Sequence, residues 1–438
     1  MGMAFTDALM DHADVRVALV DRRHSSSGHW LEAYPFVRLH QASAFYGVAS
    51  TLLGSGQLQQ RGPEEGLQER ASQSEICAYY ARMLDRMLES GKVEFFPNCE
   101  YLGDREVVSR ISGERFDVSR CRIVDARYLA PSIPAEKPPP FGVAEDAKVL
   151  AVNALARLDE APSQYVVVGS GKTATDACIW LLSRGVDPDA ICWVRPRDPW
   201  MINRAVVQPN PAVFLGMVAD TMQAAEDATS VEELFLRLEA ADIMLRIDRA
   251  VMPTMAKAPT LATWELEQLR TLENVLRRGH LQTVDRGRLT FADGSVAIAA
   301  DAVVVHCAAD GLKYPPSVPV WRPEAITLQA IRAGFPCFGA ALIGYVEATR
   351  KDDDVRNPLC PPTPYGNSMA GWVRMNVLGA RAAMSFSAEP DIKEWSDRVA
   401  LNPARIPPGH AGSAALDDAR ERLATHMRPG LARLAELM

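Results

Sequence analysis

Short apolar runs alternate with helical patterns of apolar and polar positions along most of the chain. Uniformly apolar runs of four to six residues predict buried strands, and apolar positions three and four residues apart predict amphipathic helices. The alternation of the two is typical of α/β architecture. The helix over residues 74–91 has Ser74 as its predicted cap and Gly91 as its end. We expect strands over residues 15–20, 92–96, 165–168, 191–194 and 301–306, and helices over residues 3–10, 74–91 and 172–184.

A proline-rich crossing separates two α/β units, because five prolines between Pro131 and Pro140 prevent a continuous helix. A long Leu- and Met-rich stretch follows the second unit and reads as helical, and Asp293-Gly294 between two apolar runs predicts a hairpin. We therefore predict two Rossmann-like dinucleotide-binding domains, the second inserted in the first. The predicted parts are residues 1–145 (first domain), 146–300 (second domain, with a helical insertion at about 211–278), 301–390 (return to the first domain) and 391–438 (helical tail).

Composition narrows the class of protein. The 438 residues are 48% hydrophobic and 23% charged, which is ordinary for a globular protein. A net charge of −8 without a basic stripe argues against nucleic-acid binding. No apolar run reaches the ~20 residues of a membrane span, and the start does not read as a secretory signal. The eight cysteines are scattered without a C-x-x-C pair, which favours reduced thiols in a cytoplasmic protein and disfavours a disulfide-reducing flavoenzyme. The sequence predicts no metal site, and it does not indicate the oligomeric state.

The strongest local signal is a G-x-G-x-x-A motif between the strand over residues 165–168 and the helix that follows. Gly169 permits the tight turn, Gly171 lets the backbone approach a pyrophosphate, and Ala174 allows the helix to pack closely on the strand. The helix N-terminus then offers free N–H groups and a positive partial charge to phosphates. The alternative is a turn without a ligand. The predicted cofactor contacts of this motif are Gly169, Ser170, Gly171, Lys172, Thr173 and Ala174.

The next strand ends in Arg195-Pro196-Arg197 instead of an acidic residue. An acid at this place would bind the ribose hydroxyls of NAD, whereas arginine accepts the 2′-phosphate of NADP. We therefore favour NADPH over NADH, with Arg195 and Arg197 as its ligands. The alternative is that the two arginines form a solvated edge.

The first unit carries the end of a second dinucleotide fingerprint. Gly2 and Asp21 are spaced as its last glycine and its ribose-binding acid, and Arg22 follows the acid. The strand and the two glycines that should precede Gly2 are not in the sequence. We expect the true start upstream of Met1; alternatively, the chain has lost this element and binds its cofactor differently.

Downstream, the segment from Gly28 to Gln41 contains G-x-W, Y-P and a following arginine. Here the chain resembles the flavin-containing monooxygenase and Baeyer–Villiger monooxygenase superfamily. The resemblance implies FAD in the first domain and NADPH in the second. The alternative for Trp30, Tyr34 and Arg38 is core packing with a surface cation. The resemblance places Trp30, Arg38, His40 and Gln41 along the FAD and Asp310 near its ribityl end.

These features predict an NADPH-dependent flavoprotein oxidoreductase. The resemblance further implies a monooxygenase that uses FAD and molecular oxygen on a small organic substrate, in a site that excludes water. Two alternatives stay open: an NADPH-driven reductase or oxidase without oxygenation, and a non-catalytic nucleotide-binding protein that has lost FAD. No catalytic acid or base can be named, and His40 and His306 are candidates by position only. Methionines of the predicted helical insertion line either a substrate pocket or an ordinary core.

Overall fold

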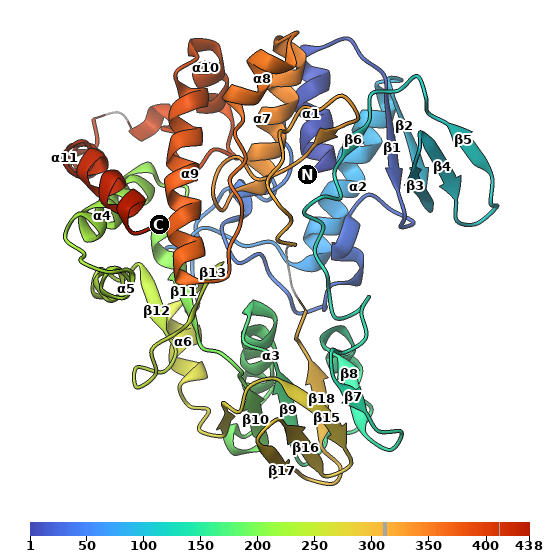
Figure 1. The fold of residues 1–438 in the computed structure, drawn as a ribbon, viewed down its shortest axis with the longest axis vertical. Coiled ribbons are helices and arrows are strands. Elements are labelled where there is room, and N and C mark those ends of the chain that lie inside the picture. Colours follow the sequence, from blue (N-terminus) through green and yellow to red (C-terminus); the bar gives the residue numbers. More distant parts are fainter. Residues whose placement is uncertain (310–312, 411) are drawn as a thin grey trace.

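The computed structural model describes residues 1–309, 313–410 and 412–438, and its architecture is mixed α/β. Two α/β units form the upper and lower lobes of the view in Figure 1, and an insertion and C-terminal helices lie beside them. We use three names for these parts below. The first unit is residues 1–125 and 326–349, the second unit is residues 142–194 and 275–306, and the insertion is residues 199–269.

The second unit is built on a five-stranded sheet in the order β14-β10-β9-β18-β8, with every pairing parallel. Every residue of the three central strands is buried, as in a parallel sheet that is covered on both faces. The strands predicted over residues 165–168 and 191–194 are confirmed. The sheet consists of β8 (Lys148–Ala151), β9 (Tyr165–Val168), β10 (Ile191–Val194), β14 (Val275–Leu276) and β18 (Val303–His306).

Different layers cover the two faces of this sheet. Helix α3 (Lys172–Ser183) and the 3-10 helix η3 (Val152–Arg157) pack on one face through a cluster that includes Val167, Leu155 and Leu181. An antiparallel meander covers the other face and contains the hairpin predicted at Asp293-Gly294. The meander consists of β15 (Leu281–Asp285), β16 (Arg288–Phe291) and β17 (Gly294–Ala297), and β7 (Gly142–Val143) pairs parallel with β15 at the edge of the same sheet.

The first unit contains two separate two-stranded parallel sheets. One pairs β1 (Val17–Asp21) with β2 (Val93–Pro97), and the other pairs β6 (Val124–Asp125) with β19 (Ile326–Thr327). No strand of the described residues joins the two sheets. Strands β3 (Cys99–Gly103), β4 (Glu106–Ser109) and β5 (Arg115–Asp117) form an antiparallel sheet of their own.

Helices hold the first unit together. Helix α1 (Gly2–His12) packs on α7 (Pro336–Thr349), and a Cβ at Gly344 would collide with the carbonyl of Phe5. Helix α2 (Gln73–Glu89) begins one residue before the predicted helix. Its cap is Ser72 rather than Ser74: the Ser72 side chain accepts from the Glu75 N–H, and the Glu75 carboxylate accepts from the Ser72 N–H.

The insertion is not wholly helical, so this part of the prediction is wrong. Strands β12 and β13 flank β11 in a three-stranded sheet. Met222 and Met244 are buried in the core of the insertion, which favours ordinary packing over a lid for these two residues. The elements are β11 (Pro199–Asn203), α4 (Pro211–Glu226), α5 (Val231–Ala240), β12 (Met244–Arg246), β13 (Met255–Leu261) and α6 (Thr263–Leu269).

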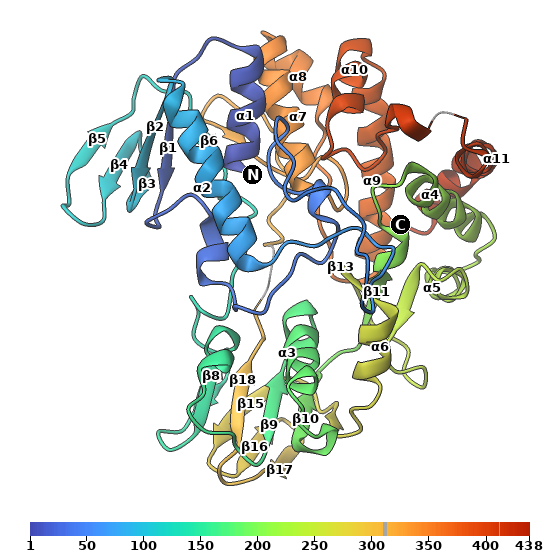
Figure 2. The ribbon, with the colours of Figure 1, turned by 180° about the vertical axis from the view of Figure 1, so that it is seen from behind.

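The C-terminal part is helical, as predicted. Helix α11 (Ala414–Glu436) lies along α4 of the insertion in both views (Figures 1 and 2). It is preceded by α8 (Asp353–Leu359), α9 (Met369–Ser387) and α10 (Pro390–Arg398). Within the described ranges, no helix is both long enough and apolar enough to span a bilayer.

Candidate functional site

The glycine turn between β9 and α3 has the geometry that its sequence predicts. Gly169 has a φ of 143°, and a Cβ there would lie 3.2 Å from the carbonyl carbon and oxygen of Cys307, which follows β18. Glycine is therefore required where two strand ends meet. At Gly171, the N-cap of α3, a Cβ would meet no described atom within 4 Å. The space before the helix is open on this side.

Several hydrogen-bond donors at this turn are free. No described side chain caps α3, so N–H groups of its first turn are available. Ser170 is buried, and its hydroxyl finds no hydrogen-bond partner among the described residues. Ala174 is fully buried, which allows the close packing expected of it. Donors without partners at a helix N-terminus suit an anion such as a pyrophosphate.

The side chain of Lys172 is committed elsewhere. Its Nζ pairs with Asp176 and lies 3.4 Å from Glu265 Oε1. Lys172 and Thr173 therefore offer their backbone N–H groups at the start of α3, while the Lys172 ammonium belongs to a buried ionic network.

A second feature lies at the carboxyl ends of the neighbouring strands β10 and β14. An open pocket of about 530 Å³ has four arginines in its lining. Arg195 directly follows β10, and its Nη2 pairs with Asp198 Oδ1 at 2.8 Å. Its Nε and Nη1 are buried and have no partner in the part of the chain that the structure describes. The four arginines, which we call the arginine pocket, are Arg195, Arg249, Arg270 and Arg277.

The arginine pocket only partly matches the sequence prediction. Arg197 is exposed and is not among the residues that line it. The sequence reasoning missed Arg249, Arg270 and Arg277, which come from the insertion, from the end of α6 and from the end of β14. Burial lowers the pKa of Arg195, and the nearby Asp198 opposes that shift. The position of Arg277 directly after a parallel strand is the only signal that could have found it.

Three of the predicted flavin residues of the first unit lie at the start of α1 and at the end of β1. Gly2 is the first residue of this helix, and a Cβ there would lie 3.4 Å from the Cβ of Ala126. Asp21 ends β1, and its Oδ1 accepts from the Arg23 N–H at 2.9 Å. Burial raises the pKa of Asp21. Arg22 pairs with Glu136 at 2.7 Å.

The segment that carries the family resemblance lies between the two units. Phe36 stacks on Trp180 of α3 with centroids 4.6 Å apart, and the Tyr34 hydroxyl donates to Asp176 Oδ2 at 2.7 Å. Trp30, in the 3-10 helix η1 (Gly28–Glu32), packs against the cores of both units. Arg38 is exposed and donates to the carbonyl of Arg70 at 2.9 Å. Trp30 and Tyr34 thus have the packing role that the sequence left as the alternative.

His40 and Gln41 lie at the same junction. His40 Nε2 is 3.2 Å from the Tyr46 hydroxyl, which also lies 3.3 Å from Gln41 Oε1. His40 Nδ1 is buried without a partner among the described residues. Burial, and then the charges of Lys172 and Arg204, lower the pKa of His40 to about 3, so its ring is neutral at pH 7.

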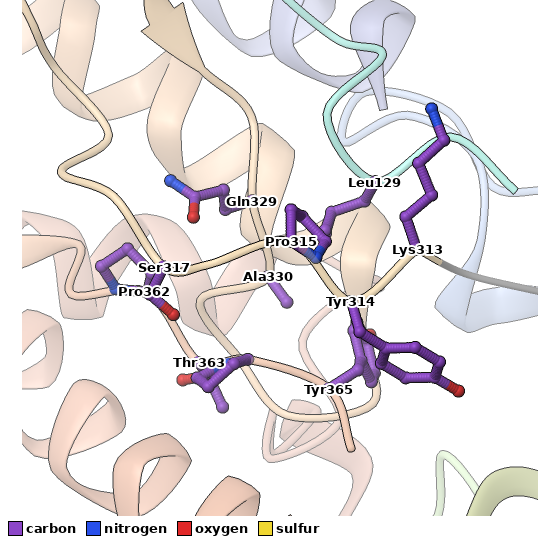
Figure 3. A pocket seen from close by; sticks show the side chains of 11 residues that line it. Leu129, Lys313, Tyr314, Pro315, Ser317, Gln329, Ala330, Pro362, Thr363 and Tyr365 are labelled. Carbon is purple, nitrogen blue, oxygen red and sulfur yellow. The ribbon is translucent and has the colours of Figure 1, made fainter. Parts of the chain in front are cut away.

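The remaining candidates lie near the return to the first unit. His306 ends β18 and is buried, and its Nδ1 accepts from the Ala308 N–H at 3.3 Å. Asp310 lies outside the described residues. A small cavity of about 10 Å³ lies nearby. Figure 3 shows that residues from separate stretches of chain line it, among them Leu129, Gln329, Thr363 and Tyr365. This volume holds no more than about one water molecule, so the cavity is no cofactor site.

Comparisons with known proteins place the chain in a family. No family model matches it. It is 40% identical over 406 residues to "Uncharacterized protein Rv2000" of Mycobacterium tuberculosis and, to the same extent, to "Uncharacterized protein Mb2023" of Mycobacterium bovis. The match covers 92% of this chain and 75% of each relative. The chain belongs to the same protein family as these two relatives.

Solved structures that match the chain include monooxygenases. Cyclohexanone monooxygenase from Rhodococcus sp. Phi1, bound to NADP+, matches with a TM-score of 0.49 and 13% identity, over 98% of this chain and 96% of the other. A mutant flavin monooxygenase from Stenotrophomonas maltophilia matches with a TM-score of 0.41 and 14% identity, over 80% and 94% of the two chains. Both matches extend over most of this chain, at low sequence identity.

Proposed function

We propose that the chain is an NADPH-dependent flavoprotein oxidoreductase whose second unit binds NADPH. The observation that carries the proposal is the pairing of an uncapped glycine turn with the arginine pocket. The turn joins β9 to α3, and Arg195 of the pocket directly follows β10, which pairs with β9. In a sheet of this topology, a dinucleotide lies across the carboxyl ends of neighbouring strands.

The free donors divide between the two phosphate positions of NADPH. The Ser170 hydroxyl and the first N–H groups of α3 suit the pyrophosphate. The Arg195 guanidinium suits the 2′-phosphate, because it is a fixed positive charge whose Nε and Nη1 donors have no partner among the described residues. Buried donors without partners are costly, so a ligand that satisfies them gains affinity.

The first unit fits part of FAD. Asp21 at the end of β1 suits the adenosine ribose, and the N-terminus of α1 at Gly2 suits a phosphate. When bound, FAD supplies electron transfer from NADPH and the activation of oxygen, and the protein supplies binding, orientation and exclusion of water.

We further propose oxygenation of a small organic substrate as the reaction. The family resemblance of residues 28–41 supports it, and so does the half-buried His40, whose pKa burial and the charge of Lys172 lower so that its ring is neutral at pH 7. A neutral imidazole adds no charge to an apolar oxygenation site. Product analysis under oxygen tests this step: peroxide formed in equal amount to the NADPH consumed, with no oxygenated product, would contradict it.

A binding experiment tests the NADPH site itself. Calorimetric titration of the purified chain should give tighter binding of NADPH than of NADH by about tenfold or more, the value of one charge-assisted contact. Arg195→Met should remove this difference, because it removes the guanidinium. Asp198 keeps its second partner, Arg277, so the substitution leaves this buried carboxylate paired. Gly171→Ala should weaken both nucleotides, since its Cβ enters the open space before α3, where no described atom lies within 4 Å. Equal affinities of the unmodified chain for NADPH and NADH would sink the assignment of the arginine pocket.

A further inference from the structure

A network of six charged side chains is buried where the first unit, the second unit and the insertion meet. Three of its members are cations and three are anions, so the network is neutral. Their side chains are between 1% and 13% exposed. Its members are Glu64 and Arg70 from the first unit, Lys172 and Asp176 from α3, and Arg204 and Glu265 from the insertion.

Arg204 is the centre of the network. Its guanidinium pairs with Glu64 and lies 2.7 Å from Glu265 Oε2. Glu64 also binds Arg70 at 2.6 Å, and Glu265 also lies 3.4 Å from Lys172 Nζ. Each of the two acids thus links Arg204 to one cation of a different unit.

The network also holds main-chain atoms of the flavin-like segment. Arg204 Nε donates to the carbonyl of His40 at 3.0 Å, and Arg70 Nη1 donates to the carbonyl of Leu39 at 2.8 Å. On the other side, Lys172 lies in the first turn of α3, where we place the cofactor phosphates. One connected set of bonds therefore joins residues 39–40 to the phosphate end of α3.

We propose that Arg204 is a positioning residue, which holds the Leu39–Gln41 segment at a fixed place relative to the phosphate-binding end of α3. The effect of this positioning on cofactor binding rests on the proposed function. Burial would raise the pKa values of Glu64 and Glu265, but Arg204 and the neighbouring cations outweigh it and lower both, so the acids stay charged. Charged pairs of fixed geometry specify one arrangement of the units, which apolar contacts alone define less sharply.

The test uses a charge-balanced variant, because loss of Arg204 alone would leave buried carboxylates uncompensated. Arg204→Met/Glu64→Gln removes one cation and one anion and keeps the network neutral. Arg204→Lys keeps the charge but not the fork of donors. The matched control is Arg237→Met/Glu233→Gln, which removes a more exposed pair on α5 with a 2.8 Å contact.

Hydrogen–deuterium exchange reads out the position of the segment. We expect amides of residues 37–46, among them the Leu39 N–H that donates to Ala71, to exchange about tenfold faster in the charge-balanced variant, while β9 is unchanged. Arg204→Lys should give a smaller change in the same direction, and the control variant none. In the unmodified chain, NADP+ should protect residues 37–46 as well as 169–176, and the charge-balanced variant should lose only the first effect.

Two outcomes separate this proposal from the proposed function. Unchanged exchange of residues 37–46 in the charge-balanced variant, or in Arg204→Lys if the double variant does not fold, overturns the positioning role. Absence of NADP+ protection at residues 169–176 in the unmodified chain overturns the NADPH site instead, and leaves the faster exchange of residues 37–46 as the test of Arg204.

Discussion

Both α/β units of this chain contain elements of a dinucleotide-binding fold, but the second unit has the more complete set. The second unit has a strand, a glycine turn and a helix in direct succession, inside a sheet of five parallel strands. The first unit has the helix α1 and the acid-ended strand β1, but its parallel strands form two separate pairs. Both units bury large apolar clusters, so both are well packed.

The difference shows that packing and a dinucleotide site are separate properties. In the second unit, the close approach of Gly169 to Cys307 exists because β9 and β18 are adjacent strands. In the first unit, a Cβ at Gly2 would meet the side chain of Ala126 at an ordinary contact distance and no other described atom within 4 Å. A cofactor turn therefore depends on neighbouring strands that force the backbone into a conformation only glycine adopts.

The largest expected effect comes from exchanging the glycines of the two units for alanine. Gly169→Ala places a Cβ 3.2 Å from the Cys307 main chain at a φ of 143°, so we expect a loss of about 2–3 kcal/mol in the free energy of unfolding. The strained turn should also lose NADPH affinity. Urea denaturation and calorimetric titration measure the two effects.

The matched change in the first unit is Gly2→Ala. Its Cβ makes an ordinary contact, and alanine favours a helix, so we expect no loss of stability. Equal destabilisation by the two substitutions would show that the second unit's turn is not special, and the comparison of the units would fail.

The sequence predicts the elements of the second unit well for a physical reason. Uniformly apolar strands such as β9 and β10 and the glycine motif are local patterns, which one window of sequence contains. The insertion was harder, because β12 pairs with β11 across 40 residues and its own three residues carry no strand pattern. Of the arginine pocket, the sequence predicts only Arg195, because the tertiary structure brings the other three arginines to the site.

The next effect concerns the junction of the units and depends on pH. His40 has a folded-state pKa of about 3, against an ordinary value of 6.5. Between these values the unfolded chain binds a proton that the folded chain does not, so this group's contribution to stability is full above pH 6.5 and is lost as the pH falls. Its slope is at most about 1.4 kcal/mol per pH unit.

His40→Gln should therefore flatten the fall in unfolding free energy between pH 6.5 and pH 5, as measured by urea denaturation at several pH values. His24→Gln changes an exposed histidine of the first unit and serves as the control. If His40→Gln kept the slope of the unmodified chain, as the control should, then burial at the junction would not lower the pKa of His40 in the folded state.

The smallest effect separates two arginines of the second unit's site. Arg249 lines the arginine pocket and Arg197 does not, although the sequence favours Arg197. We expect Arg249→Ala to weaken NADPH binding by about threefold to tenfold, because an exposed guanidinium near a phosphate contributes about 1 kcal/mol. Arg197→Ala should change it less than about twofold, and NADH binding should respond to neither substitution. The reverse ranking of the two variants would mean that the 2′-phosphate lies on the exposed loop after β10, outside the pocket, and that local sequence was the better guide to this end of the site.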